Sequence, residues 1–339
     1  MVTIQQIADA LSLSTTTVSR AISGKGRVSE KTRLLVKNYI DSVGYQPNAI
    51  AQGLAQSKSF SLALIIPKDI NASCSFFFYE CILGICEVAE SSGYNIIVVT
   101  SDEDSYTSYE HLIQKRKVDG LILTRLYDDD MAVSHLISMK IPFLVIGEAN
   151  DERVTEVCNN YIEASKTLTS YFLDSGSRRI LFIEGDAKHK ISQSRESGFT
   201  AAFESSVNNS AKSHILRNMK SETDIEMHLP RTLQQFHPDA VIASDDVLCE
   251  WALPVITHMN YRIPHDIRVA SCIDSQLLQR HTPAITAIDI NTTLLAKTAG
   301  KVLIDQLEGR KYEQKTIVPY SILLRESTKK VSIHSEKLS

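Results

Sequence analysis

A run of hydroxyl side chains that ends in an arginine lies close to the N-terminus. Its members are Thr15, Thr16, Thr17, Ser19 and Arg20. Short hydroxyls can hydrogen-bond base edges in the major groove of DNA, and arginine can bind a guanine or a phosphate. The start of a helix also attracts phosphate through its free N–H groups and its dipole. The run therefore has the chemistry of a DNA-reading helix, in which Thr15 and Thr16 select bases and Arg20 contacts a guanine or a phosphate.

Two short helices must position this run. Apolar residues recur at helical spacing before and after a break at Ser12–Ser14, and they predict one inner face for each helix: Ile4, Ile7, Ala8 and Leu11, then Val18, Ala21 and Ile22. A helix-turn-helix inserts the start of its second helix among base edges, which is where the hydroxyl run lies. The pattern alone is also compatible with an ordinary pair of surface helices.

A third helix is predicted from about Glu30 to Val43, with Ser29 as its N-cap. Five of its apolar residues are expected to pack on the first two helices: Leu34, Leu35, Tyr39, Ile40 and Val43. Ser29 and Thr32 are placed to touch phosphate. After Pro47, Asn48 can cap a short helix over 49–55, which is too short to be stable alone in water.

From Ser61 onward, apolar strands alternate with longer helical stretches, and a second series of the same kind begins after 154–159. Repeated strand and helix units predict parallel sheets. The expected fold class is therefore a small all-α helix-turn-helix headpiece plus an α/β body with two doubly wound parallel-sheet subdomains. Ligands of such folds bind outside the carboxyl ends of the strands, so we expect a cleft between the two subdomains.

Composition narrows the function classes. Residues 1–58 hold seven Lys/Arg against three Asp/Glu, whereas the remainder holds 29 against 37, so a basic head precedes an acidic body. This imbalance suits attraction of phosphate by the head. The six cysteines form no metal-binding or disulfide pattern, and the chain has neither a leader-like start nor a long apolar run. We expect a cytoplasmic protein, nucleoid-associated when bound to DNA, without membrane, metal or cofactor.

No phosphate-binding loop, nucleophile elbow, zinc-protease pair or dinucleotide fingerprint occurs in the sequence, so we do not expect an enzyme. Lys188, His189 and Lys190 follow a predicted strand and are placed near the mouth of the cleft. They would meet an anionic ligand there or serve only as surface charge.

The first 55 residues closely resemble the headpiece of the lactose/galactose repressor (LacI/GalR) family. The matching signals occur in the family's order: Thr17–Arg20, Val28–Thr32, Gly44–Asn48 and Ala51–Leu54. Ser12 departs from the family, which usually has Gly at this bend, and a left-handed Ser costs roughly 1 kcal/mol. The resemblance continues more loosely to about residue 328, through VDGLIL, RRILFIEG, SRESGF and LLREST.

The resemblance implies an organisation and further DNA-binding residues. It implies a helix-turn-helix domain over 1–46, a hinge helix and linker over 47–60, an effector-binding and dimerisation domain over 61–328 of periplasmic-binding-protein-like type, and a tail over 329–339. Subdomain 1 would comprise about 61–158 and 288–316, and subdomain 2 about 159–287 and 317–328. Leu54 would be a wedge in the minor groove, with Asn48, Ala51 and Gln52 beside it; its alternative is a plain linker residue.

The family's effector site can be carried over to this sequence. Arg195, three residues before Gly198-Phe199, and Asp274, after RVASCI, are implied to bind effector, or else to form a structural ion pair. Ser244 and Asp245 stand where the family usually has Asn-Asp. The other candidates come from subdomain 1: Asp69, Phe76, Phe77, Thr124, Gly147 and Glu148. Phe76 or Phe77 would cover the apolar face of a sugar, or else pack in the core.

The resemblance implies a ligand-gated transcriptional regulator. It would be a homodimer that represses a carbohydrate-utilisation operon from a palindromic operator, and a small sugar or sugar phosphate would change its DNA affinity. Arg217-Asn218-Met219 lacks the family's Gly-Asp-aromatic run, so a purine would lose its stacking ring. The tail lacks apolar heptads, which favours a dimer. The alternatives are a purine or another non-sugar effector, and a non-regulatory sugar-binding protein.

Overall fold

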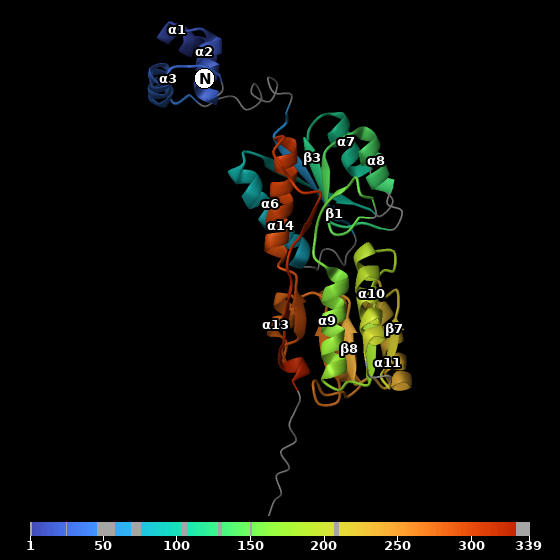
Figure 1. Ribbon diagram of the computed structural model, residues 1–339. Helices are drawn as coiled ribbons and strands as arrows, with labels where there is room; N and C mark the ends of the chain where they lie inside the picture. The colour runs from blue at the N-terminus through green and yellow to red at the C-terminus, as the bar shows by residue number, and fades with distance from the viewer. Residues whose placement is uncertain are drawn as a thin grey trace, which may run out of the picture. The chain divides into compact units, whose positions relative to one another are not determined.

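The computed structural model describes residues 2–24, 26–45, 58–68, 76–102, 107–127, 131–149, 151–206 and 210–329. The chain forms two compact units, Met1–Ser59 and Phe60–Ser339 (Figure 1). Five of the predicted site residues lie outside the described residues: Asn48, Ala51, Gln52, Leu54 and Asp69.

The first unit contains three helices, α1 (Ile4–Leu11), α2 (Thr15–Ser23) and α3 (Glu30–Val43). A hydroxyl caps each start, because the side chains of Thr3, Ser14 and Ser29 accept backbone N–H groups that have no partner within the helix. Ser12 takes the left-handed conformation at the bend, with φ 52° and ψ 41°. The helix-turn-helix is therefore present, and the turn tolerates a residue other than Gly.

The inner face of α3 differs from the expectation. Val36 is buried with Ile7, Ala8, Val18 and Ala21, and Tyr39 and Ile40 pack against this cluster. Leu34 and Leu35, which we expected to pack there, are 54% and 49% exposed. Each residue turns an α-helix by about 100°, so Leu34 lies nearly opposite Val36 and Leu35 lies at the edge of the buried face.

The second unit contains two six-stranded sheets among its described residues. The first sheet has the order β11-β5-β4-β3-β1-β2, and all its neighbours are parallel. Its strands are β1 (Ser61–Pro67), β2 (Asn95–Ser101), β3 (Gly120–Leu123), β4 (Phe143–Ile146), β5 (Thr155–Cys158) and β11 (Lys315–Ile317). Helices α6 (Phe76–Ser91) and α14 (Thr292–Leu307) cover one face, and α7 (Thr107–Gln114) and α8 (Met131–Met139) cover the other (Figure 1).

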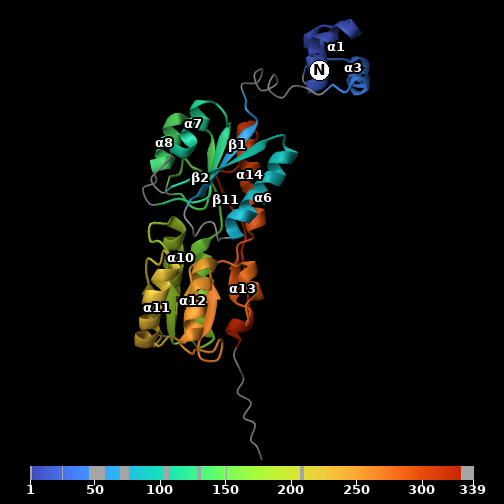
Figure 2. The same ribbon diagram turned by 180° about the vertical axis from the view of Figure 1, so that it is seen from behind.

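The second sheet has the order β12-β10-β9-β8-β6-β7, and only the β10–β12 pair is antiparallel. Its strands are β6 (Arg179–Ile183), β7 (Lys212–Leu216), β8 (Ala240–Ala243), β9 (Arg268–Ser271), β10 (Thr286–Asp289) and β12 (Ser321–Leu323). Helices α9 (Tyr161–Asp174) and α10 (Lys190–Ser205) cover one face; α11 (Glu222–Phe236) and α12 (Asp246–His258) cover the other (Figures 1 and 2). The short helices α13 (Gln276–Arg280) and η1 (Glu326–Thr328) complete this subdomain.

Three segments carry the chain between the subdomains: β5 to α9, β10 to α14, and β11 to β12. Asn159 lies in the first and is fully buried. Its Nδ2 donates to the carbonyl oxygens of Ile290, 3.0 Å away in the second segment, and Val318, 2.9 Å away in the third. This one amide therefore ties the three segments together on the side where the chain crosses.

Close packing of α9 on α10 requires a glycine at position 198. A Cβ there would collide with the Ile162 carbonyl oxygen and lie 2.9 Å from Ser165 Cβ. We expect Gly198→Ala to lower the free energy of unfolding by about 3 kcal/mol, because overpacking displaces a helix. The matched helical control is Gly300→Ala, where the nearest atom would be Val88 Cβ at 3.5 Å. Urea unfolding compares the two, and equal stabilities of the variants would contradict this account of the packing.

Candidate functional site

A cavity of about 530 Å³ lies between the two subdomains. In each sheet the strand order reverses beside the first strand, giving β2-β1-β3 and β7-β6-β8. The loops after such strands diverge and leave a crevice where doubly wound folds bind ligands. Most lining residues follow these strands: Lys68 after β1, Thr124–Tyr127 after β3, six residues between Gly185 and Arg195 after β6, and five residues between Asp245 and Trp251 after β8. The two crevices face each other and form one cavity.

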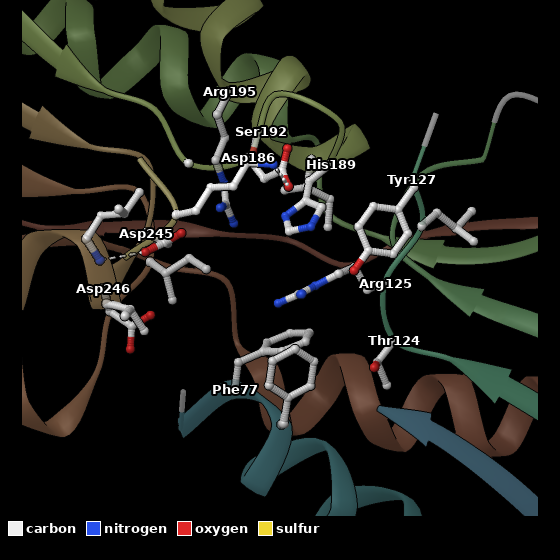
Figure 3. A pocket seen from close by; sticks show the side chains of 18 of the residues that line it. Phe77, Thr124, Arg125, Tyr127, Asp186, His189, Ser192, Arg195, Asp245 and Asp246 are labelled. Atoms are coloured by element: carbon white, nitrogen blue, oxygen red, sulfur yellow. Dashed lines mark hydrogen bonds and ion pairs between the residues drawn. The ribbon is translucent and has the colours of Figure 1, made fainter. Parts of the chain in front are cut away.

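Arg195 and Asp245 bring opposite charges to this cavity from subdomain 2. Arg195, on α10, is 6% exposed, and its Cζ lies 5.6 Å from the ring centroid of Tyr161. Asp245 is the N-cap of α12, and its Oδ1 accepts the N–H of Leu248 at 2.8 Å. Burial raises the pKa of Asp245, while this backbone contact and the charges of Arg195 and Arg125 act in the opposite direction. Figure 3 shows both arginines reaching into the cavity from opposite sides.

A second carboxylate, Asp246, lines the same wall. Burial, with repulsion from Asp245, raises the pKa of Asp246 to about 7. The two neighbouring carboxyls therefore retain a proton at pH values where isolated ones have lost it. The wall offers both donors and acceptors, which is the pattern needed to bind hydroxyl groups.

The subdomains also touch directly at the cavity wall. Tyr127 and His189 form an isolated antiparallel bridge, and their ring centroids lie 4.8 Å apart (Figure 3). The N–H of Lys190 donates to the Leu126 carbonyl oxygen at 3.3 Å. Nearby, Ser194 Oγ donates to Glu148 Oε2 at 2.5 Å. These contacts join the two subdomains directly, in addition to the crossing segments.

The described DNA-binding candidates of the first unit differ in how exposed they are. Thr16, Ser19 and Arg20 are exposed on α2. Thr15, Thr17 and Thr32 are half-buried. The Thr17 and Thr32 hydroxyls lie 2.8 Å and 2.7 Å from the capping oxygens of Ser14 and Ser29. Thr17, Ser29 and Thr32 therefore have a capping role in the structure.

Comparison with known proteins decides the family. Residues 3–48 match the family described as bacterial regulatory proteins, lacI family, and residues 169–328 match a periplasmic binding protein-like domain. The HTH-type transcriptional regulator MalR of Staphylococcus xylosus is 32% identical over 339 residues, which cover 97% of this chain and 98% of that protein. The chain belongs to the LacI family.

Two further LacI-family proteins illustrate the range of the similarity. The ribose operon repressor of Halalkalibacterium halodurans is 26% identical over 97% of this chain and 98% of its own. The lac repressor dimer bound to operator and the anti-inducer ONPF has the same fold, with a TM-score of 0.78, 20% identity, and coverage of 96% of this chain and 99% of its own. The family consists of DNA-binding transcriptional regulators, so the expected class of protein is confirmed. Within the described residues, no helix has the length and apolarity needed to cross a membrane.

The structure brings four of the predicted effector residues of this LacI-family protein to the cavity wall: Phe77, Thr124, Arg195 and Asp245. Thr124 Oγ1 donates to the Ile65 carbonyl oxygen at 2.8 Å, which fixes the loop after β3 to β1. Phe76, Gly147, Glu148 and Ser244 are not among the lining residues. Gly147 and Glu148 follow β4, one strand away from the order reversal, and Glu148 instead contacts Ser194. Ser244 Oγ accepts the N–H of Gly185 at 3.3 Å behind the wall.

Asp274 is not among the lining residues either. Its two carboxylate oxygens accept from Arg325, at 2.6 Å from Nη1 and 2.7 Å from Nη2. The side chains are 8% and 16% exposed. Arg325 Nη1 also donates to the Ile285 carbonyl oxygen at 2.7 Å. Asp274 therefore belongs to a nearly buried ion pair that joins the loop after β9 to the segment that follows β12.

Sequence reasoning missed several lining residues. Arg125 and Tyr127 directly follow the predicted Thr124, and Trp251 lies on α12 after Asp245. For Arg125 and Tyr127, the available signal was their position just beyond the end of β3.

His189 lines the cavity, whereas Lys188 is not among the lining residues. Met219 has no aromatic ring, but Phe77, Phe78, Tyr127, Tyr161 and Trp251 supply five from other elements. A missing ring at Met219 is therefore no argument about the ligand.

Glu184, directly after β6, is a buried carboxyl whose raised pKa can be tested. Its side chain is 1% exposed, and Arg217 Nε lies 3.8 Å from its Oε2. Arg217 also pairs with Glu196. Burial, together with the neighbouring Glu196, raises the pKa of Glu184 to about 7.

A raised carboxyl pKa in the folded state means that stability is lost as the pH rises from about 4.5 to about 7. We expect Glu184→Gln to raise the free energy of unfolding by about 1–3 kcal/mol at pH 8 and by little at pH 4.5. Urea unfolding at the two pH values measures this difference. Glu204→Gln, exposed on α10, is the control. The same gain for Glu184→Gln at both pH values would contradict the assignment.

Proposed function

We propose that this LacI-family protein represses transcription from a palindromic operator and that a small sugar or sugar phosphate in the cavity changes its operator affinity. The main support for this proposal is the cavity between the two subdomains, which is lined by Arg195 and Asp245, in a chain that also contains a helix-turn-helix. The repressed genes would serve carbohydrate use. The names of two relatives, the MalR regulator and the ribose operon repressor, support this effector class.

The chemistry of the wall supports a polyol as effector. Charge-assisted hydrogen bonds from Arg195 and to Asp245 are directional, and they strengthen when water is excluded. Aromatic rings can cover the C–H faces of a sugar. Phe77 and Thr124 of subdomain 1 would act with Arg195 and Asp245 of subdomain 2, so that the ligand bridges both. The other candidates would contribute to effector binding from the periphery of the cavity or through other residues: Asp69, Phe76, Gly147, Glu148 and Ser244.

Regulation would follow from the two-lobed site. A ligand that contacts both subdomains favours one separation between them, and it changes DNA affinity only by its differential affinity for the two states. The contacts Tyr127–His189 and Ser194–Glu148 are the direct bonds that such a change would alter. Residues 47–60 would act as hinge helix and linker between a head over 1–46 and a body over 61–328, in a homodimer.

The proposed DNA contacts come from both the reading helix and the hinge. Thr15, Thr16, Ser19 and Arg20 would contact bases or phosphate, and the capping residues Thr17, Ser29 and Thr32 would support the helix starts close to phosphate. Asn48, Ala51, Gln52 and Leu54 would act at the minor groove, with Leu54 as the wedge. Wedge contacts offset the unstacking only at the correct central step.

DNA binding by the full chain should depend steeply on salt. After a binding selection from random duplexes, the selected operator is titrated at several salt concentrations. The logarithm of the association constant is expected to fall linearly with that of salt, by about 0.9 per phosphate contacted. If Arg20 contacts a phosphate, Arg20→Ala reduces this slope by about one; if it contacts a base, the slope stays. A flat titration, or no enriched sequence, would contradict the proposal.

The effector class can be tested without knowing the operator. A ligand that binds only the folded protein raises its stability by RT ln(1 + [L]/Kd), so a thermal-shift panel of sugars, sugar phosphates and purines separates the classes. The five rings around the cavity would also accept a purine base. Shifts from purines alone would remove the sugar effector and leave the repressor function standing.

A further inference from the structure

One wall of the cavity follows α12 for more than a helical turn. Val247, Leu248 and Trp251 all line the cavity. They stand at i, i+1 and i+4, so they share one face of the helix. Asp245, at the N-cap, lines the cavity from the same helix. The polar contact at the start of α12 and the indole ring therefore border one continuous space.

The hydrophobic core of subdomain 2 supports the Trp251 side chain. Trp251 is half-buried and packs against this core, which includes Leu248 and Met219. Met219 also lines the cavity, from the loop after β7. A large ring that is backed by the core loses little conformational freedom when a ligand contacts it. Met219, Leu248 and Trp251 thus form an apolar part of the wall, distinct from the polar part at Arg195 and Asp245.

The spacing along α12 sets the length of a ligand that uses both parts. Trp251 stands six positions after Asp245, which corresponds to about 9 Å along the helix axis. This distance is longer than one pyranose ring, and a cavity of about 530 Å³ has room for a second ring. A single hexose held at Arg195 and Asp245 would leave the indole uncovered.

The pairing of the two lysines in the cavity wall indicates a neutral ligand. Lys220 follows Met219 in the chain, and its Nζ lies 2.7 Å from Asp186 Oδ2. Lys68, the other lysine of the wall, lies 3.2 Å from Asp102 Oδ2. Both lysines thus have a carboxylate partner, and such pairs offer donors and acceptors to hydroxyl groups more readily than a free positive charge to a phosphate.

We propose that Trp251 is a specificity-determining residue that binds the second ring of a neutral two-ring saccharide, whose first ring is held by Arg195 and Asp245. The inference rests on the proposed effector site and narrows its ligand class. The C–H face of the second ring packs on the indole, and its hydroxyls face Lys220 and Asp186.

The first test uses the full-length protein and its single tryptophan, because Trp251 is the only Trp of the chain. The probes are maltose, cellobiose and lactose, with glucose and galactose as their constituent monosaccharides. At least one disaccharide is expected to change the tryptophan emission and to bind at least about tenfold more tightly than its constituents. No emission change and no binding with any of the three disaccharides would overturn the inference.

The second test assigns the gain to the indole. Calorimetric titration of Trp251→Ala with that disaccharide is expected to show a loss of about tenfold, with monosaccharide affinity within about twofold of the original protein, while Trp251→Phe keeps most of the disaccharide affinity. Circular dichroism and operator binding check that the variants fold. Equal losses for one-ring and two-ring ligands would overturn the inference. A monosaccharide or sugar phosphate that alone alters operator affinity would also overturn it, yet would leave the proposed repressor function intact.

Discussion

Replacing Arg20 with alanine is expected to weaken specific operator binding by about 10- to 100-fold, since a good arginine contact to a base contributes about 1–3 kcal/mol. Arg20 is exposed on α2, where its side chain can reach DNA. Thr16→Ala should cause a smaller loss that is confined to particular base positions. Fluorescence anisotropy with the selected operator measures both.

Arg280→Ala provides a matched control, because Arg280 is exposed on α13 in the other unit. It should leave operator affinity unchanged, and none of the three variants should alter effector affinity. If Arg20→Ala and Thr16→Ala keep both the affinity and the sequence preference of the original protein, α2 is not the reading helix.

Arg195→Ala is expected to reduce effector affinity by about 100-fold and to remove the effector response, while operator binding persists. Its guanidinium is nearly buried in the cavity wall, and a charge-assisted hydrogen bond there contributes about 1.5–3 kcal/mol. Calorimetric titration with the ligand identified by thermal shift measures the affinity. Anisotropy with operator, with and without that ligand, measures the response.

Asp274→Asn is the contrasting variant, because both residues were expected at the effector site. Asp274 is paired with Arg325, and neither side chain is among the lining residues, so the substitution should lower the free energy of unfolding by about 3 kcal/mol and leave effector affinity unchanged. A loss of effector affinity in Asp274→Asn that matches the loss in Arg195→Ala would return Asp274 to the binding site.

The headpiece was predictable from sequence because its signals are local. Capping hydroxyls at Ser14 and Ser29 and apolar residues at helical spacing define each helix without reference to the rest of the chain. The exceptions are Leu34 and Leu35, since an apolar residue beside the inner face cannot be told from one on it by type alone. Their exposure depends on where α1 and α2 meet α3.

The candidate site was predictable only in part because its geometry depends on strand order. Asp245 and Thr124 follow strands at the order reversal and reach the cavity, whereas Gly147 and Asp274 follow strands farther away. All four stand just after a strand in the sequence, so the alternation of strands and helices cannot separate them. Trp251 lies eight residues beyond the end of β8, and only the orientation of α12 brings it to the wall.

The central claim, that ligand in the cavity controls DNA binding, is tested most directly by a reciprocal titration. Operator affinity of the full chain is measured with and without the ligand, and ligand affinity with and without operator, at one salt concentration. Ligand and operator are expected to change each other's affinity by the same factor, about 5- to 150-fold, and Arg195→Ala is expected to remove the ligand's effect. A ligand that binds through Arg195 but leaves operator affinity unchanged would contradict the central claim.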